Sequence, residues 1–302
     1  MAIRYTVLKD LGPQERYVAV LDILGFRRIV HEHDTTALVD LLSHLQDMTT
    51  VATGFLAERE AGKRIRVHRV QYSDSYLLYT DDIGPIHLDL MVRSVASVIS
   101  ALMLWGVLVR GAIVRGDLFV SGNRQIFAGK ALVRAHDLER QLDWAGAILD
   151  VDTIASDDEK RVIERVELRE GWLMDCEVPW KNGRARGLAV GWPFWVQGGD
   201  ISHYQEEVQN LLPDPDPEQQ QKQNNTWAFF EEHRRTYPKS PLATLAELTP
   251  EAQERFNQLK EFFSGQSAEE RRQAETQGIS MLDFMSDRLK ERLSARESED
   301  DD

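Results

Sequence analysis

The chain has 302 residues and a formal net charge of −14, with 42% hydrophobic and 28% charged residues. This size and composition are typical of a globular protein with a sizeable core. The acidic charge argues against nonspecific binding to nucleic acid or to an anionic membrane, because both require a basic surface. A nucleotide substrate stays open, since bound divalent cations can reverse the local charge.

The chain shows no sign of export or of a membrane span. Its single cysteine, Cys176, cannot form an internal disulfide, and the first ten residues lack the apolar core of a signal peptide. Both features favour a reducing, cytoplasmic location. The longest apolar run, from Val95 to Val109, is shorter than the roughly 20 residues that span a bilayer. We interpret it as a buried helix that leads into a strand.

Strand and helix patterns alternate along the first two thirds of the chain. Strands are predicted over residues 4–9, 17–23, 65–71, 75–79, 107–114 and 147–151. Helices are predicted over residues 34–60, 86–105 and 129–142. Residues 118–127 are predicted to form a loop or hairpin with Gly122-Asn123 at its tip. This order predicts an α/β (α+β) fold in which helices flank a central antiparallel sheet, mainly on one face.

The pattern changes after about residue 205. The run from Pro213 to Pro217, followed by QQQKQNN, is interpreted as a polar linker. The aromatic residues Trp227, Phe229 and Phe230 predict a helix that packs back on the domain. Charged helical patterns and an acidic tail, expected to be disordered, complete the chain. We therefore predict a catalytic domain over 1–205 and a helical C-terminal extension over 206–302.

Two acidic residues are the strongest candidates for chemistry. Asp22 ends the strand-forming run that starts at Tyr17, and Asp74 lies between two short strands. An ionised carboxylate beside a buried strand needs a partner, and a metal cation supplies one. Gly25 allows backbone N–H groups to approach a phosphate closely. The pair predicts a two-metal phosphoryl-transfer site. The alternative, a helix cap at Asp22 and a simple turn at Asp74, stays open.

Four segments resemble the class III nucleotidyl cyclases, in the right order and over about residues 15–200. They are LDILGF from Leu21, YSDS from Tyr72, VRGAIVRG from Val109 and GKALVRAHDLE from Gly129. The resemblance implies a ferredoxin-like cyclase fold. It also implies that Asp22, Asp74 and the backbone carbonyl of Ile23 hold two Mg²⁺ or Mn²⁺ ions, while the ribose 3′-oxygen attacks the α-phosphorus and pyrophosphate leaves.

At three positions this sequence departs from the pattern of the adenylate cyclases. Val70 stands where adenylate cyclases carry the lysine that reads adenine, and Val133 and Asp137 stand where they carry an asparagine and an arginine. The motif strings are more similar to those of the Pycsar pyrimidine cyclases. That resemblance implies conversion of UTP to 3′,5′-cyclic UMP in antiphage defence, with a separate effector protein that reads the product. It also implies a homodimer with its site at the interface.

Further residues are candidates for nucleotide binding, each beside a structural alternative. Phe26 lies in the LDILGF segment, and Tyr72 either narrows the base pocket or packs in its strand. Lys130 either meets a pyrimidine carbonyl or is a solvated lysine at a helix start. Lys181 either binds the triphosphate or is simply an exposed lysine at the tip of a hairpin.

Two arginines on one predicted strand are weighed against each other. Arg110 and Arg115 are five residues apart, so they point to opposite faces and at most one faces the site. Arg115, at the strand end, is preferred as the phosphate contact. The histidines show no spacing that predicts a zinc site.

Other functions stay open at this point. The chain can instead be a cytidylate cyclase that makes cyclic CMP, a purine cyclase or another palm-type nucleotidyltransferase. It can also be a non-catalytic cyclase-like module that only binds nucleotide or dimerises. Retention of both aspartates argues against the last alternative, because a binding-only module does not need two metal ligands.

Overall fold

The computed structural model describes residues 11–54, 58–60, 63–103, 105–121, 124–164, 168–193 and 201–238. The chain divides into two compact units, Met1–Ala246 and Glu247–Asp302, and all the described residues belong to the first. The predicted strand over 4–9, the Gly122-Asn123 tip and the charged C-terminal region lie outside the described residues. The boundary of the first unit falls later than the domain end predicted near residue 205.

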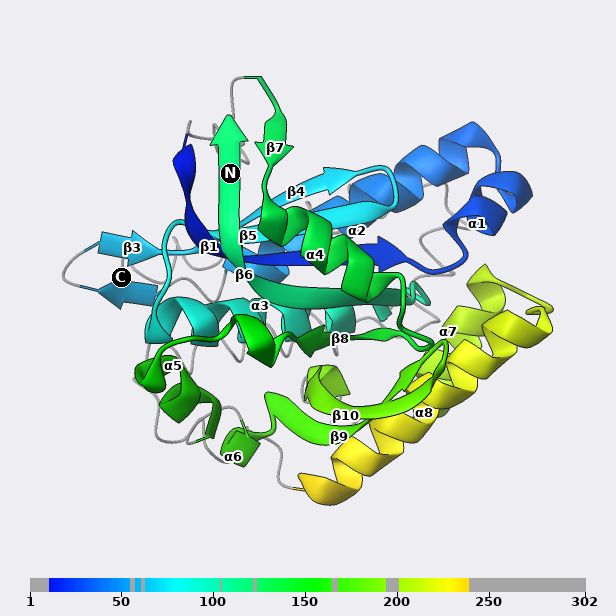
Figure 1. Ribbon diagram of the computed structural model, residues 1–302. Helices are drawn as coiled ribbons and strands as arrows, with labels where there is room; N and C mark the ends of the chain where they lie inside the picture. Colours follow the sequence, from blue (N-terminus) through cyan, green and yellow to red (C-terminus); the bar gives the residue numbers. More distant parts are fainter. Residues whose placement is uncertain are drawn as a thin grey trace, which may run out of the picture. The chain divides into compact units, whose positions relative to one another are not determined.

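The described strands form one large sheet and a small separate hairpin (Figure 1). The large sheet contains β1 (Leu11–Ile23), β4 (Val67–Tyr72), β5 (Ser75–Thr80), β6 (Val109–Ser121), β7 (Ile126–Ala128), β8 (Gly146–Leu149), β9 (Leu173–Trp180) and β10 (Gly183–Val190). Its order is β4-β5-β1-β6-β8-β10-β9, with β7 paired to β6. The small hairpin pairs β2 (Glu58–Glu60) with β3 (Lys63–Ile65).

The predicted central antiparallel sheet is confirmed. Among the described pairings, β6 with β8 is parallel and the others are antiparallel. A parallel pair needs a crossover, and here α4 (Lys130–Glu139) crosses from β6 to β8.

Helices cover both faces of the sheet, not mainly one as predicted. Val18 and Val20 of β1 pack with Ala131 and Ala135 of α4. In Figure 1, α4 lies in front of the sheet, and α3 (Pro85–Met103) and α2 (Thr35–Gly54) lie behind it. Side chains alternate along a strand, so a strand such as β1, apolar at almost every position, has two faces to bury and needs cover on each.

The apolar run noted in the sequence lies in α3 and the following β6. By length and composition α3 could cross a membrane, and it is the one such helix among the described residues. Most of α3 is buried inside the protein, between the sheet and α2. The helix predicted to reach residue 60 ends earlier, because Glu58–Glu60 forms β2.

Short helices connect the larger elements. They are α1 (Phe26–Glu32), the single 3₁₀ turn η1 (Val151–Thr153), α5 (Asp157–Val162) and α6 (Leu168–Glu170). Gly25, the N-cap residue of α1, has a φ of 76°, a left-handed conformation that favours glycine. An added Cβ there would lie 2.8 Å from Leu212 Cδ1, so the turn after β1 is closed against the C-terminal part of the chain.

The segment predicted to be a linker instead starts a helix. α7 (Ile201–Leu211) is followed by α8 (Pro217–Thr236), whose N-cap is Asp216. The Asp216 carboxylate accepts from the N–H of Gln219 at 2.8 Å, and Pro217 occupies the first turn, where its missing N–H costs nothing. Prolines and glutamines are common in linkers, but the capping pattern of Asp216, Pro217 and Gln219 starts a helix here.

The aromatic residues of α8 anchor it on the sheet, as predicted for Phe229 and Phe230. Both are buried, and their rings contact those of Trp144 and Trp192. Burial of each phenylalanine contributes about 1.5–3 kcal/mol. His233 is fully buried in the same layer, and its Nε2–H donates to the carbonyl of Gly171 at 2.8 Å.

His233 makes this attachment sensitive to acid. Burial lowers the pKa of His233 to about 4, while the bond to Gly171 opposes that shift. The unfolded chain therefore takes up a proton between pH 6.5 and pH 4 that the folded chain resists, and stability falls as the pH falls. We predict that His233 makes wild-type protein lose about 2 kcal/mol more stability from pH 7 to pH 5 than a His233→Gln variant loses.

Urea unfolding at the two pH values measures this difference. His31→Gln is the matched control, because His31 is exposed and its replacement should leave the wild-type pH dependence unchanged. Equal pH dependence in wild type and His233→Gln would contradict the prediction.

Candidate functional site

The register of β1 brings polar side chains into one row across the sheet. Asp22 lies opposite Ser75 of β5 and opposite Arg110 of β6. Ser75 in turn lies opposite Tyr72 of β4. Residues that lie directly opposite share a face, so these four side chains, called here the Asp22 row, are on the face that α4 covers. The Ser75 hydroxyl donates to Asp22 Oδ1 at 3.0 Å.

The second aspartate is tied to the end of β1 by the backbone. Asp74 lies in the two-residue turn between β4 and β5, where Ser73 has a φ of 52°. The carbonyl of Asp74 accepts from the N–H of Ile23 at 2.8 Å. The turn is therefore fixed beside the residue that follows Asp22, and the structure brings the two predicted metal ligands together.

Asp22 is partly desolvated, and among the residues that the structure describes its ion-pair partner, Arg110, is a distant one. Burial raises the pKa of its carboxyl, and the negative charge of Asp74 raises it further. The Ser75 hydroxyl and the positive charge of Arg110 oppose that shift. Arg110 comes only to 4.0 Å from Asp22, measured between Nη2 and Oδ2. The site thus carries more negative charge than its protein partners neutralise.

Arg110 is engaged mainly by the end of α4. Its Nε–H donates to the carboxylate of Glu139, and its Nη1 donates to the carbonyl of Leu142 at 3.3 Å. Glu139 is almost completely buried, with 2% of its surface exposed. Burial raises the pKa of Glu139, and the charge of Arg110 opposes the shift. His136, one turn earlier on α4, is close enough to lower the pKa of Asp22.

These residues fit a magnesium or manganese site made of oxygen ligands. Two carboxylates and the backbone carbonyl of Ile23 are the donor types that these cations prefer. Magnesium is commonly held by one or two carboxylates, with the remaining positions filled by substrate phosphates and water. Among the residues that the structure describes, no three His, Cys, Asp or Glu side chains gather as a metal cluster. A cation here therefore depends on Asp22 and Asp74 together with the substrate.

Three other predicted residues lie at the same end of the sheet. Phe26 opens α1, four residues after Asp22, and is half-buried. Tyr72 belongs to the Asp22 row, is 42% exposed and contacts the edge of Phe127, with ring centroids 5.7 Å apart. Lys181 is exposed in the turn between β9 and β10.

The Lys181 turn is attached to the end of α4. The backbone N–H of Lys181 donates to the carbonyl of Gln141 at 2.8 Å, two residues after Glu139. This bond places the lysine beside the end of the helix that holds Arg110.

The other two predicted residues lie at the opposite end of the strands. Arg115 is opposite Tyr17, five residues from Asp22 along β1, or about 17 Å at the usual rise of a strand. Its guanidinium pairs with Glu159 at 2.8 Å and with Glu15 at 2.7 Å. Lys130 is exposed at the start of α4, next to Ala131, which packs on Gly116. Arg115 is therefore far from Asp22 within one chain, and Lys130 is at the end of α4 opposite to Glu139.

The sequence prediction favours Arg115 over Arg110, whereas the structure places Arg110, together with Glu139, beside Asp22. The two arginines do point to opposite faces, as their odd spacing predicts. Which arginine shares a face with Asp22 depends on the pairing of β1 with β6, a long-range contact. Glu139 had a signal in the sequence, because it continues the buried stripe of Ala131 and Ala135 at intervals of four residues.

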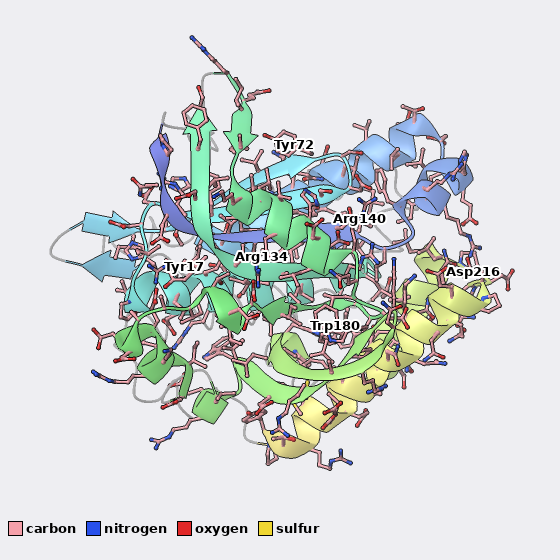
Figure 2. The ribbon with its side chains drawn as sticks, viewed as in Figure 1. Tyr17, Tyr72, Arg134, Arg140, Trp180 and Asp216 are labelled. Carbon is pink, nitrogen blue, oxygen red and sulfur yellow. The ribbon has the colours of Figure 1, made fainter. Side chains whose placement is uncertain are left out.

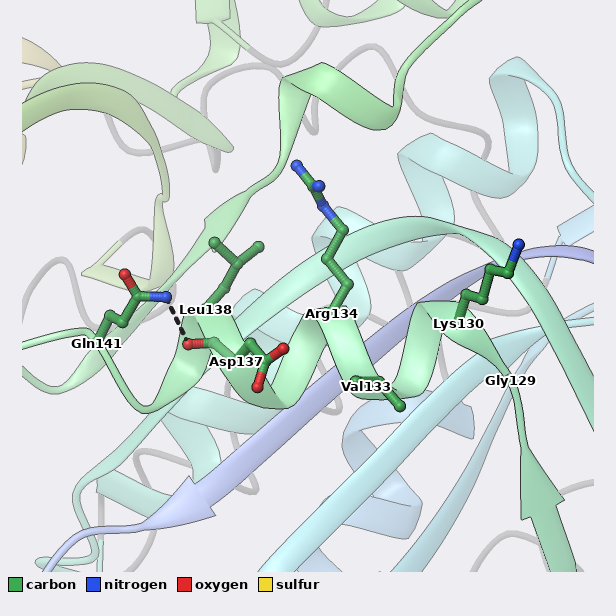
Figure 3. A pocket seen from close by; sticks show the side chains of 7 residues that line it. All are labelled: Gly129, Lys130, Val133, Arg134, Asp137, Leu138 and Gln141. Atoms are coloured by element: carbon green, nitrogen blue, oxygen red, sulfur yellow. Dashed lines mark hydrogen bonds between the residues drawn. The ribbon is translucent and has the colours of Figure 1, made fainter.

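The outer face of α4 is hollowed. A cavity of about 640 Å³ is lined by Gly129, Lys130, Val133, Arg134, Asp137, Leu138 and Gln141 (Figure 3). Val133 is 61% exposed there. Arg134 is fixed by both oxygens of the Asp150 carboxylate, and Figure 2 shows it on the front of the molecule. Lys130 is exposed on this surface, and Gln141 Nε2 donates to the backbone carbonyl of Asp137 at 2.8 Å, as Figure 3 shows.

No protein-family model and no curated protein matches the chain. Among solved structures, it is similar to the catalytic core of a rhodopsin-guanylyl cyclase with converted specificity in complex with ATPalphaS. The TM-score is 0.42 at 16% identity, over 59% of this chain and 97% of that one.

Two further solved structures give comparable values. For the dimeric guanylyl cyclase domain of RhoGC from the fungus Blastocladiella emersonii, the TM-score is 0.41 at 15% identity, covering 59% of this chain and 97% of that one. For the adenylyl cyclase CyaB from P. aeruginosa, it is 0.38 at 18% identity, covering 60% and 96%. These scores are too low to assign the chain to a family, and its function is inferred below from its own residues.

The electrostatics of Asp22 predict that its charge costs folding stability in the absence of a cation. Because the pKa of Asp22 is raised in the folded protein, stability falls as the pH rises from about 3.8, the usual value of the unfolded group, through the folded pKa. The full cost is present above the folded pKa. We predict that Asp22→Asn is equally or more stable at pH 7 with a chelator present, since asparagine still accepts from Ser75.

Chemical denaturation of both proteins at pH 7 and pH 4 measures the effect. The advantage of the variant should shrink at the lower pH, where Asp22 takes up a proton. A variant clearly less stable than wild type at pH 7 would show that the Asp22 charge is instead well compensated by its neighbours.

Proposed function

We propose that the protein is a nucleotide cyclase that converts a pyrimidine nucleoside triphosphate, UTP ahead of CTP, into a 3′,5′-cyclic monophosphate and pyrophosphate. The observation that carries this proposal is the pairing of Asp22 and Asp74 at the end of a buried strand, where Arg110 comes only to 4.0 Å from Asp22. The LDILGF, YSDS, VRGAIVRG and GKALVRAHDLE segments, which resemble those of pyrimidine cyclases, support it.

The roles of the residues follow from the chemistry of an in-line displacement. Asp22, Asp74 and the Ile23 carbonyl would hold magnesium or manganese, which when bound acidifies the ribose 3′-hydroxyl and neutralises the triphosphate. The 3′-oxygen bonds to the α-phosphorus while the bond to the β-phosphate oxygen breaks. Lys181, exposed beside the end of α4, would meet the departing pyrophosphate.

The proposed choice of a pyrimidine rests on the surroundings of β4. Val70 replaces the lysine that purine cyclases use to read adenine, and it packs with Phe127 against the apolar cluster under α4. Tyr72, two residues later on the same face, adds a bulky wall at the edge of the site. Val70 removes the donor that would read adenine, and Tyr72 reduces the space for a purine base at the edge of the site.

The proposed preference for UTP rests on Lys130. Uracil presents a carbonyl at the fourth ring position, which a lysine donor suits, whereas cytosine presents an amino group there. Two donors that face each other stay unpaired, at a cost of about 1–3 kcal/mol. That cost corresponds to roughly tenfold or greater discrimination.

A homodimer is proposed because the site is incomplete in one chain. Ala131, the neighbour of Lys130, packs on Gly116, six residues along β6 from Arg110, so Lys130 is at the end of α4 opposite to Glu139, which holds Arg110. Two chains related by a two-fold axis can combine Asp22 of one chain with Lys130 of its partner, and then form two such sites.

The proposed role of the product is signalling. A cyclic pyrimidine nucleotide has no place in nucleic-acid synthesis, and the resemblance to antiphage cyclases supports a second messenger read by a separate effector protein in the cytoplasm. Among the alternatives, a purine cyclase is disfavoured by Val133 and Asp137, which line the open face of α4 where purine cyclases carry an asparagine and an arginine.

Incubation of the full chain with equimolar ATP, GTP, CTP and UTP and Mn²⁺ tests the function. We predict that UTP is consumed first, that the product is cyclic UMP, and that Asp22→Ala and Asp74→Ala abolish turnover while the chain still folds. Lys130→Ala should lower the ratio of UTP to CTP turnover about tenfold. Near-normal activity in either aspartate variant would rule out the two-metal site, and purine consumption would rule out the base assignment.

Mixing two impaired variants tests the composite site. Asp22→Ala and Lys130→Ala should each be impaired alone, whereas a mixture allowed to exchange subunits should recover activity, because one of the two sites in each heterodimer is then intact. Light scattering should show a dimer at micromolar concentration. A monomer that turns over nucleotide, or the absence of recovery on mixing, would contradict the shared site.

A further inference from the structure

Arg110 lies between two carboxylates and is not shared equally between them. Its Nε–H donates to Glu139, and its Nη1 is held by the carbonyl of Leu142 at 3.3 Å. Toward Asp22 it presents only Nη2, at 4.0 Å from Oδ2, which is beyond hydrogen-bond distance. Strand pairing places Arg110 directly opposite Asp22, so nothing in the backbone prevents a closer pair.

The difference between the two carboxylates follows from burial. The Glu139 side chain is 3% exposed and that of Asp22 is 26% exposed. Attraction between charges is stronger where water is excluded, and an unpaired buried carboxylate is costly. Arg110 therefore stabilises the fold most when it stays on Glu139. Because Glu139 is on α4 and Asp22 is on β1, the packing of that helix decides where the guanidinium lies.

The consequence concerns the cation proposed for this site. An arginine in full contact with Asp22 would occupy its oxygens and repel a divalent ion at the same position. We propose that Glu139 is a positioning residue: it holds Arg110 away from Asp22 and thereby keeps the Asp22 carboxylate free for a divalent cation. This inference rests on the proposed function to the extent that Asp22 is a metal ligand.

The same strand offers a matched comparison. Arg115, five residues along β6, pairs with Glu159 at 2.8 Å, and the side-chain exposures of that pair, 13% and 1%, are close to those of Arg110 and Glu139. The Arg115–Glu159 pair is also buried and also joins β6 to a helix, but it lies at the far end of β1 from Asp22. Its loss should cost stability without affecting the cation site.

Direct binding of Mn²⁺ to the full chain, followed by electron paramagnetic resonance without nucleotide, tests the proposal. Relative to wild type, Glu139→Gln should weaken Mn²⁺ binding by about 10- to 100-fold, because Arg110 is released onto Asp22. Arg110→Gln should bind Mn²⁺ as tightly as wild type or more tightly, and the double variant should return close to wild type. Glu159→Gln should bind Mn²⁺ like wild type.

The opposite signs of the two single substitutions separate this role from simple bracing. If Arg110 and Glu139 only support the site, both substitutions weaken binding, and that result overturns the proposal. If Glu139→Gln does not fold, weaker binding by Arg110→Gln alone overturns it. Unchanged binding in Glu139→Gln overturns this inference but leaves the proposed function intact. Absence of Mn²⁺ binding by wild type overturns both.

Discussion

The pairing of β1 with its two neighbours is the constraint on which the site depends. Antiparallel register places Asp22 between Ser75 and Arg110, and a slip of one residue would turn Asp22 to the opposite face of the sheet, toward α3. The slip is prevented by the apolar residues on both faces of β1, since Val18 and Val20 would lose their contacts with α4. The same packing that stabilises the sheet therefore fixes the position of the carboxylate.

The charged groups at this end of the sheet come from four elements. β1 and the β4–β5 turn supply Asp22 and Asp74, α4 supplies Glu139, and β6 supplies Arg110. One guanidinium cannot neutralise three carboxylates, and desolvation raises the pKa of both Asp22 and Glu139. This local excess of negative charge agrees with the acidic composition of the chain. It also gives a physical reason for a polyanionic substrate to arrive together with divalent cations.

The C-terminal helices belong to the same compact unit as the site. Arg28 of α1 donates to the carbonyls of Pro213 and Asp214, just before α8, and Leu212 packs on Gly25. A cavity of about 210 Å³ separates the turn after Asp22 from the first turns of α8, with Gln219 and Lys222 in its wall. The turn that follows β1 is thus supported by residues about 190 positions later in the sequence.

The sequence by itself determined the alternation of strands and helices, the positions of Asp22 and Asp74 at strand ends, and the opposite directions of Arg110 and Arg115. These features depend on local periodicity and turn chemistry, which neighbouring residues set. Only the tertiary structure decided that Arg110 shares a face with Asp22, that Glu139 holds it, and that Lys130 lies at the far end of the strands. Strand register and helix packing join residues distant in the chain, so no local pattern contains them.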